Sequence, residues 1–596
     1  MLPFLLGLDF ILLLVFGGYT SGWEQFDYWW GGGAVACGAF LLSGRPLRIH
    51  VLSLFLLPAL AALALPWVWT SMVVQNLCWW FLGLFLMIFL PTRNENCEAI
   101  GEILFYLVLC CGVVLTILYL IQDTLALPVR GFGYARSAEA QVLLGALACL
   151  LFKPNGSRLW QIVGFVVVGY GVYSNGSRSA WLGAGMLLAG YLWMRRKAYW
   201  TCALIAMAAV TIVVGLSLQR MAADPHAEVR GHVYMLAAQI FSEHPAGSGA
   251  GTFLTESLSR SFPVDDHRYL SRYAKIIPHA HNVILQWAAE GGVTGMATVI
   301  GILASCGLML ANRMRRRAGG WPIVAAVAWC PAFVFELMLN VTESLSFIRW
   351  MGLVGVLALT TEYSVPLPRV SPKAVRLCLL VLGGAMIFVG WNDLMARQSV
   401  RIGINEEGRG NRAEALKSYE DARTRRPWDE QALLHIAHAA VAMGRRDLAE
   451  ASIDQALRLD QGQGAARYHG AGFCREMFVQ GRGETGARLF HKSRHLMFTL
   501  NDLQPCDVPM YLEGIAWSRG DSEIRWRLRR VLSLEPRAVR AYESMARIAA
   551  SAGDAGRAER FRTLAERLRQ LYEPGILRGL AASSARSVYR YERHLL

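Results

Sequence analysis

Two histidines and an asparagine lie within four residues, at His279, His281 and Asn282, and these residue types are well suited to chemistry. They follow a long polar segment and precede an apolar run that begins at Val283. A neutral imidazole can accept a proton near neutral pH, so the cluster could supply a general base. A structural interpretation is also open, in which Asn282 caps a helix and the histidines lie at a membrane interface.

Arg178 stands between Ser177 and Ser179, immediately before another apolar run. The planar fork of donors on a guanidinium matches phosphate oxygens and stays charged at any working pH, so Arg178 could hold a phosphate. The alternative is an arginine that only extends to lipid headgroups.

A glycine-rich turn follows the helical pattern that opens at Arg230. The pattern stops at residues 244–253, where Gly247, Gly249 and Gly251 alternate with other residues. Glycines at this density let a backbone turn sharply or come close to a ligand. Both a phosphate-binding loop and a flexible turn are compatible with this spacing.

The composition is that of a polytopic membrane protein. Of 596 residues, 54% are hydrophobic and only 17% are charged, against about 25% in a soluble domain. Positive loops and solvated helix faces account for the net charge of +15 without nucleic acid. The first apolar run lacks a basic start and a small-residue cleavage site, so we expect it to be retained as a span. The twelve cysteines show no CxxC or Cys/His spacing, so no metal site is expected.

Apolar runs of near-spanning length continue to about residue 392. We expect thirteen spans, or twelve if one is re-entrant, near 3–20, 28–43, 51–68, 72–91, 103–122, 141–153, 159–175, 180–195, 199–217, 283–311, 321–340, 346–363 and 376–392. The basic loops between them fall on one side, which the positive-inside rule makes the cytoplasm. The long loop 218–281 and everything after residue 393 then lie on the opposite side.

The C-terminal third has a different character and carries a helical repeat. Gly410, Ala415 and Ala422 recur 34 residues later at Gly444, Ala449 and Ala456, and again at Gly553, Ala558 and Ala565. A period of 34 residues is that of tetratricopeptide (TPR) helix pairs. We therefore expect an all-α protein with a membrane domain at 1–395 and a TPR-like domain at 400–596, which could bind a protein partner. In this domain Cys474 and Cys506 are either bonded or two separate thiols.

Taken in order, these motifs resemble the O-antigen ligase, polymerase and protein O-oligosaccharyltransferase superfamily of bacterial inner membranes. The resemblance covers roughly 140–360, and its most specific part is the block from His279 to Gly292, His-x-His-Asn-x-x-Leu-Gln-x-x-x-Glu-Gly-Gly. It implies transfer of a glycan from undecaprenyl diphosphate to an acceptor hydroxyl at the periplasmic face, without metal or cofactor. Its essential arginines match Arg178 and Arg230, and its essential histidine matches His279 or His281.

One motif departs from the protein-glycosylating branch. That branch carries a Glu-Tyr-Pro-Leu-like motif in the next outward loop, where this chain has Thr342 to Ser346. Glu343 in this loop, like Asn282, could orient an acceptor, and the acceptor itself stays open between a protein and a glycolipid or growing polysaccharide.

The bottom-up chemistry agrees with the resemblance. Two arginines at the diphosphate would stabilise the departing anion. His281, nearest the helix start whose dipole favours a neutral imidazole, is the expected base, and His279 is an expected substrate contact. The competing class is a lipid-linked glycan transporter with a periplasmic scaffold. Transporters need ionisable groups near the bilayer midplane, and the candidates inside expected spans are Asp9 and Glu336, each near one end of its span.

Overall fold

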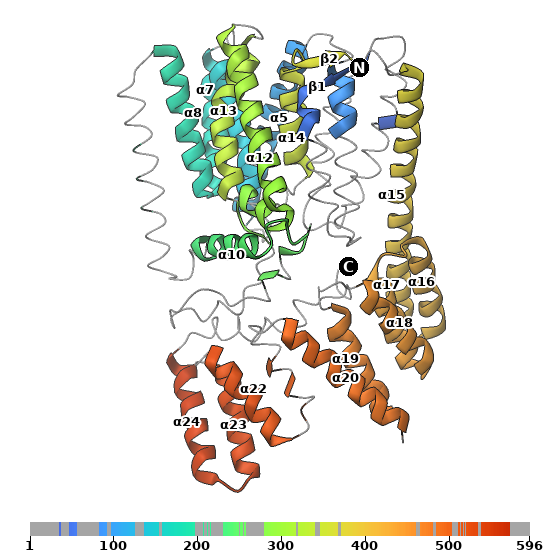
Figure 1. The fold of residues 1–596 in the computed structure, drawn as a ribbon. Coiled ribbons are helices and arrows are strands. Elements are labelled where there is room, and N and C mark those ends of the chain that lie inside the picture. Colours follow the sequence, from blue (N-terminus) through green and yellow to red (C-terminus); the bar gives the residue numbers. More distant parts are fainter. Residues whose placement is uncertain are drawn as a thin grey trace.

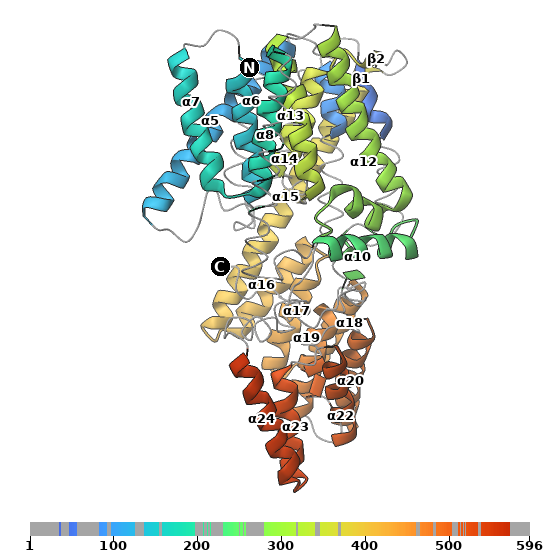
Figure 2. The same ribbon diagram turned by 90° about the vertical axis from the view of Figure 1, so that its left-hand side faces the viewer.

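The structure is a computed structural model of the full chain (Figures 1 and 2). It describes chiefly residues 47–55, 83–91, 97–125, 136–153, 158–196, 230–249, 279–316, 320–339, 346–366, 371–459, 465–480, 484–503, 521–534 and 538–571, with short pieces between them. The all-α fold expected from the sequence is confirmed. The described residues also contain two three-residue strands, β1 (Arg48–His50) and β2 (Ser364–Pro366), which pair antiparallel.

The membrane half is a bundle of long apolar helices. Among the described residues, four helices are long and apolar enough to cross a membrane: α5 (Cys97–Thr124), α12 (Val283–Arg315), α13 (Gly320–Leu339) and α15 (Pro372–Gly408). Beside them pack α6 (Arg136–Phe152), α7 (Arg158–Asn175), α8 (Arg178–Arg196) and α14 (Ser346–Leu359). These eight helices coincide with eight of the expected spans. The other five fall wholly or largely outside the described residues.

Large apolar side chains on the outside of the bundle are exposed, among them Val166 on α7, Leu308 on α12 and Phe388 on α15. Many exposed apolar side chains on one bundle are costly in water and favourable against lipid tails. The bundle is therefore that of a membrane protein.

One end of the bundle carries the small sheet and the basic residues expected to face the cytoplasm. Arg48 on β1 donates to the Ser364 hydroxyl at 2.9 Å, and Arg313 near the end of α12 donates to the Leu359 carbonyl. Arg48 and Arg313 belong to two of the basic loops that are expected on the same side, and both contact the segment from Leu359 to Ser364. Figures 1 and 2 show α10 (Arg230–Glu243) and the repeat helices beyond the opposite end.

The repeat domain has no separate linker to the membrane domain. The 37 residues of α15 form one continuous helix, about 55 Å long, whereas a bilayer core needs roughly 30 Å. Its last turns pack on α16 (Arg412–Arg425), where Asp393 forms a buried ion pair with Arg426 at 2.9 Å. The expected boundary near residues 395–400 therefore falls inside a helix that both domains share.

Further helices continue the solenoid from this shared helix. They are α17 (Glu430–Ala442), α18 (Arg446–Leu459), α19 (Ala465–Gln480), α20 (Glu484–Leu503), α22 (Asp521–Leu534), α23 (Val539–Ser551) and α24 (Ala555–Leu571). Neighbouring helices pack as antiparallel pairs, with α17 on α18, α19 on α20 and α23 on α24. Cys474 lies buried in this core, and burial raises the pKa of its thiol to about 12. Cys506 lies outside the described residues.

The three sequence repeats have the same turn. Gly410, Gly444 and Gly553 all adopt positive φ, at 85°, 71° and 78°. After each glycine the next backbone N–H donates to the carbonyl five residues earlier, at 2.9 Å in every case: Asn411 to Glu406, Arg445 to Ala440 and Asp554 to Ala549. This is the Schellman helix end, which glycine adopts without steric cost. The paired alanines that follow are buried, as the repeat pattern predicts.

Candidate active site

The start of α12 is built by the residues of the histidine motif. Asn282 caps the helix, and its side chain accepts from the Leu285 N–H at 3.1 Å, as expected. One turn further, Gln286 reaches back so that its Oε1 accepts from the Ala280 N–H at 2.7 Å. The Gln286 amide also donates to Glu290 at 2.8 Å. Asn282, Gln286 and Glu290 follow one another at intervals of four residues, so their side chains lie on one helix face. Gln286 thereby holds Ala280, the residue between the two histidines.

His281 has an unusual backbone. Its φ of 51° makes it the one residue other than glycine with positive φ among the described residues. The backbone at His281 is therefore not extended, and the chain reverses there so that Ala280 reaches Gln286 while Asn282 caps α12. A left-handed residue with a Cβ costs about 1–2 kcal/mol, and such strain gathers at functional sites.

His279 is partly buried and is held neutral. Burial lowers the pKa of His279 to about 4, and the neighbouring His281 contributes a second, smaller lowering. The pKa in the folded protein lies below the ordinary value of 6.5, so His279 binds its proton only near pH 4. At neutral pH its ring can therefore donate one hydrogen bond and accept another.

The glycine-rich turn after α10 docks on a break in α12. Gly292 has φ 63° and ψ −155°, which interrupts the helix and frees the carbonyls of Ala289 and Glu290. These carbonyls accept instead from the N–H groups of Ser248 and Gly249, at 3.0 and 2.9 Å, and Val293 N–H donates to the Pro245 carbonyl at 2.9 Å. The structure thus shows the turn bonded through its backbone to α12, an arrangement that differs from both interpretations of the sequence.

Two glycines make this approach possible. A Cβ at Gly247 would lie 2.4 Å from the Glu290 carbonyl oxygen, and one at Gly292 would lie 2.4 Å from the Pro245 carbonyl oxygen. Both obstacles are backbone atoms, which cannot rotate away as a side chain would. The break leaves the 23 residues from Val293 to Arg315, about 34 Å of helix, to cross the membrane, and it places the histidine end of α12 beyond the span.

We expect Gly292→Ala to lower activity by about 10²-fold, because displacing the histidine segment by about 1 Å spoils the geometry of reaction. It should also lower thermal stability in detergent, since alanine at this φ is strained by about 1–3 kcal/mol. Gly307→Ala is the matched control in the same helix, where a new Cβ has no neighbour within 4 Å. Equal activity in the two variants would show that the close approach is not needed.

Arg178 is the first residue of α8, at a corner that contacts α13. The hydroxyls of its two neighbours, Ser177 and Ser179, lie 2.6 Å apart, and Ser179 donates to Glu336 Oε1 at 2.8 Å. Glu336 is buried near the end of α13. The Ser-Arg-Ser motif is thus bonded to the neighbouring helix.

Tyr234 on α10 joins the remaining parts. Its hydroxyl lies 3.3 Å from the carbonyl oxygens of His281 and Met338, so it bonds to the start of α12 and to the end of α13. Arg230 begins α10 one turn before Tyr234, which places the two on the same helix face. The Arg230 side chain and the whole of Glu343 lie outside the described residues.

The structure therefore gathers Arg178, Arg230 and His281 at one end of the bundle, each at the beginning of a helix. Sequence reasoning did not find Tyr234, because a tyrosine in an amphipathic pattern gives no sign of its partners. Glu336 had appeared only as an ionisable group within a span. Its position one turn before the next outward loop was the available signal that it borders the site.

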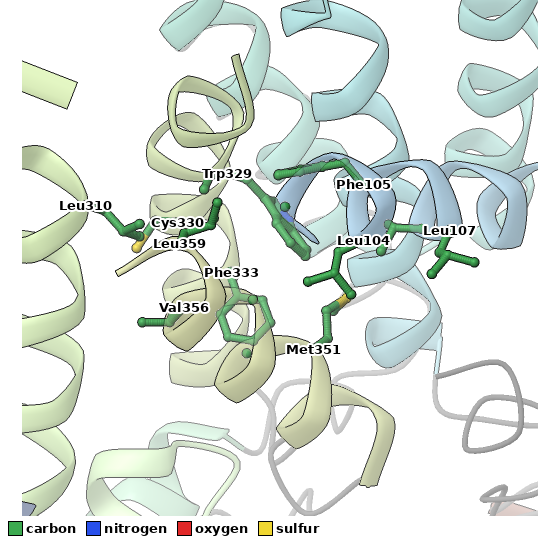
Figure 3. Close-up of a pocket in the computed structure, with 15 residues that line it drawn as sticks. Leu104, Phe105, Leu107, Leu310, Trp329, Cys330, Phe333, Met351, Val356 and Leu359 are labelled. Atoms are coloured by element: carbon green, nitrogen blue, oxygen red, sulfur yellow. The ribbon is translucent and has the colours of Figure 1, made fainter. Parts of the chain in front are cut away.

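The bundle also contains an apolar cavity of about 90 Å³ between α5, α12, α13 and α14 (Figure 3). Leu104, Trp329, Phe333, Met351 and Val356 are among its lining residues. The close-up shows no carboxylate, imidazole or guanidinium among the labelled side chains. The residues that line the cavity include no carboxylate, imidazole or guanidinium, so the cavity does not offer the acid–base groups of the histidine motif.

Comparison with known proteins identifies the same region. Residues 163–300 match the O-antigen ligase family, a segment that holds Arg178, Arg230 and the histidine motif, so the resemblance found in the sequence is confirmed there. No curated protein matches the chain. The crystal structure of yeast Tom70 aligns over 83% of this chain and 93% of that chain, with 10% identity and a TM-score of 0.24, which is too low to support an argument about fold.

Proposed function

We propose that this chain, whose residues 163–300 form an O-antigen ligase domain, transfers a glycan from undecaprenyl diphosphate to an acceptor hydroxyl. The reaction takes place where α8, α10 and α12 begin. It needs no metal or cofactor and inverts the anomeric carbon.

The observation that supports this proposal best is the meeting of three helix N-termini. Tyr234 ties α10 to α12 and α13, and Ser179 ties α8 to α13. Each helix start carries a partial positive charge, and two of them also begin with an arginine. Such a place favours a diphosphate, as helix N-termini commonly do.

The proposed step balances as a single displacement. The acceptor oxygen attacks the anomeric carbon while His281 takes the hydroxyl proton, and the carbon–oxygen bond to the diphosphate breaks. The bond electrons leave with undecaprenyl diphosphate. Arg178 and Arg230 stabilise the negative charge that develops on the leaving group. His279, neutral at working pH, contacts a substrate by hydrogen bonds.

The acceptor is a protein or a glycolipid hydroxyl. The repeat helices lie beyond the same end of the bundle as the site (Figures 1 and 2). Helix-pair solenoids commonly present a binding surface to other proteins, so we assign the repeat domain to acceptor choice or to partner binding.

A membrane assay tests the activity. Purified undecaprenyl-diphosphate-linked glycan is mixed with the full chain in vesicles and offered protein and glycolipid acceptors. Loss of the lipid-linked donor together with glycan on an acceptor supports transfer, and glycan added to the donor's own glycan indicates a polymerase. Movement of intact donor between leaflets without new linkages would favour the transporter.

We place the chain in the bacterial inner membrane with the site and the repeats in the periplasm. A reporter that fluoresces only in the cytoplasm, fused after Leu571 at the end of α24, should stay dark in cells. The same reporter inserted between α12 and α13, after Arg316, should fluoresce. Bright cells with the first fusion would reverse the orientation and contradict the proposed site.

A further inference from the structure

A chain of hydrogen bonds passes through the Ser-Arg-Ser corner and joins two buried carboxylates. The Tyr119 hydroxyl donates to Glu139 at 2.5 Å, and the Asn175 amide donates to that hydroxyl at 2.7 Å. The Asn175 side-chain oxygen accepts from the Ser177 N–H at 3.2 Å. The contacts described above then continue from Ser177 through Ser179 to Glu336.

This network is buried far more deeply than a loop corner usually is. Glu139, Tyr119, Asn175 and Glu336 are each at most 2% exposed. Buried carboxylates cost free energy, and a polar network in a low dielectric holds one geometry more firmly than single bonds would. It links α5, α6, α7, α8 and α13 at one point.

The corner that it holds would otherwise be free to bend. Asn175 ends α7 and Gly176 has φ 65°, so the chain turns sharply before α8. The two serines that flank Arg178 are both within the network. The backbone at Arg178 is therefore fixed on each side, and the direction in which its side chain leaves α8 follows from the network.

We propose that Glu139 and Glu336 are positioning residues for Arg178. Through Tyr119, Asn175 and the two serines they aim its guanidinium at the diphosphate of the donor. This inference rests on the proposed function and adds to it the residues that direct the arginine. None of the residues in this network needs to touch the substrate, because they act through Arg178, which does.

Tyr119→Phe tests the network with the smallest change, because it removes one hydroxyl and keeps the ring. We expect kcat/KM for the donor to fall about tenfold, the effect of losing hydrogen bonds to a buried carboxylate and amide. Tyr106→Phe, on the same helix, is the matched control and should change kcat/KM less than twofold. Tyr106 packs against Trp321 at the other end of α5.

A double-mutant cycle separates positioning from simple stability. In an Arg178→Lys background the direction of the backbone matters less for binding, because the lysine side chain is flexible and lacks the planar fork of donors. Tyr119→Phe should therefore lower kcat/KM by no more than about twofold in that background. An equal fall in both backgrounds would show that the network only stabilises the fold and would overturn the inference. Ser179→Ala, which cuts the link to Glu336, is expected to repeat the pattern and replaces Tyr119→Phe if that variant does not insert.

A binding measurement keeps the inference independent of glycan transfer. Inorganic pyrophosphate should protect Arg178 from phenylglyoxal in the unmodified chain and in Tyr106→Phe, as followed by mass spectrometry. Protection at Arg178 should require about tenfold more pyrophosphate in Tyr119→Phe. Equal protection in all three proteins, or none in any of them, would overturn the positioning role. If protection behaves as expected and no acceptor is ever glycosylated, only the proposed transfer fails.

Discussion

His281→Ala should bind the lipid-linked donor and lower kcat by about 10²–10⁴-fold, the usual contribution of a general base. The backbone strain at His281 supports this choice over His279, because a costly left-handed conformation is kept where the side chain must be aimed. His279→Ala should mainly raise KM, the substrate concentration needed for half of the maximal rate. Donor binding and turnover are measured separately in membranes. Full activity of His281→Ala would end the assignment, and loss of donor binding would make His281 a diphosphate contact.

The pH dependence separates the two histidines. Because the pKa of His279 is lowered to about 4, this ring stays neutral from pH 8 down to about pH 5. It therefore cannot cause a fall in activity over that range. We expect any fall in kcat on acidification through this range to persist in His279→Ala, and the residual activity of His281→Ala is measured over the same range. Disappearance of the fall in His279→Ala would exchange the two roles.

Arg178→Lys and Arg230→Lys should each lower kcat/KM by at least about 10²-fold. Lysine keeps the charge and loses the planar pair of donors that fits two phosphate oxygens. The loss should appear mainly in kcat, since the charge that the arginines meet develops as the diphosphate departs. The rate of glycan transfer is measured at saturating donor, which gives kcat, and at limiting donor, which gives kcat/KM.

Arg315→Lys is the matched control for both substitutions. Arg315 is exposed in the last turn of α12, at the opposite end of the bundle. It should retain near-normal kcat/KM. Near-normal transfer by both site variants would leave headgroup contact as the better account of Arg178 and Arg230.

Local patterns predicted the features that depend on nearby residues. The helix start at Asn282 could be read from one capping side chain before an apolar run. The repeat turns at Gly410, Gly444 and Gly553 could be read from a fixed period, because each turn uses the same bond between residues five apart. The charge of the loops predicted which helix ends lie at the same end of the bundle.

Contacts between distant segments could not be predicted in the same way. A helix that is apolar on every side does not reveal which neighbour it faces. The sequence therefore could not predict that Tyr119, Glu139 and Asn175 contact one another. The close approach of Gly247 to Gly292 had no local sign beyond a dense group of glycines. Histidine is not a residue type that indicates positive φ. The backbone conformation of His281 depends on the hydrogen bond that Gln286 accepts from the preceding residue, Ala280.

Because the two domains share α15, the direction in which the repeat domain faces depends on the rotation of the backbone along this helix. In α15, which runs unbroken from Pro372 to Gly408, each residue adds about 1.5 Å of rise and about 100° of rotation. One residue inserted between the span and Asp393 would swing the whole solenoid by more than a quarter turn about the axis of α15. Seven residues would restore its direction to within about 20° and raise it by about 10 Å. The direction of the surface offered to an arriving partner is thus set by the number of residues in α15.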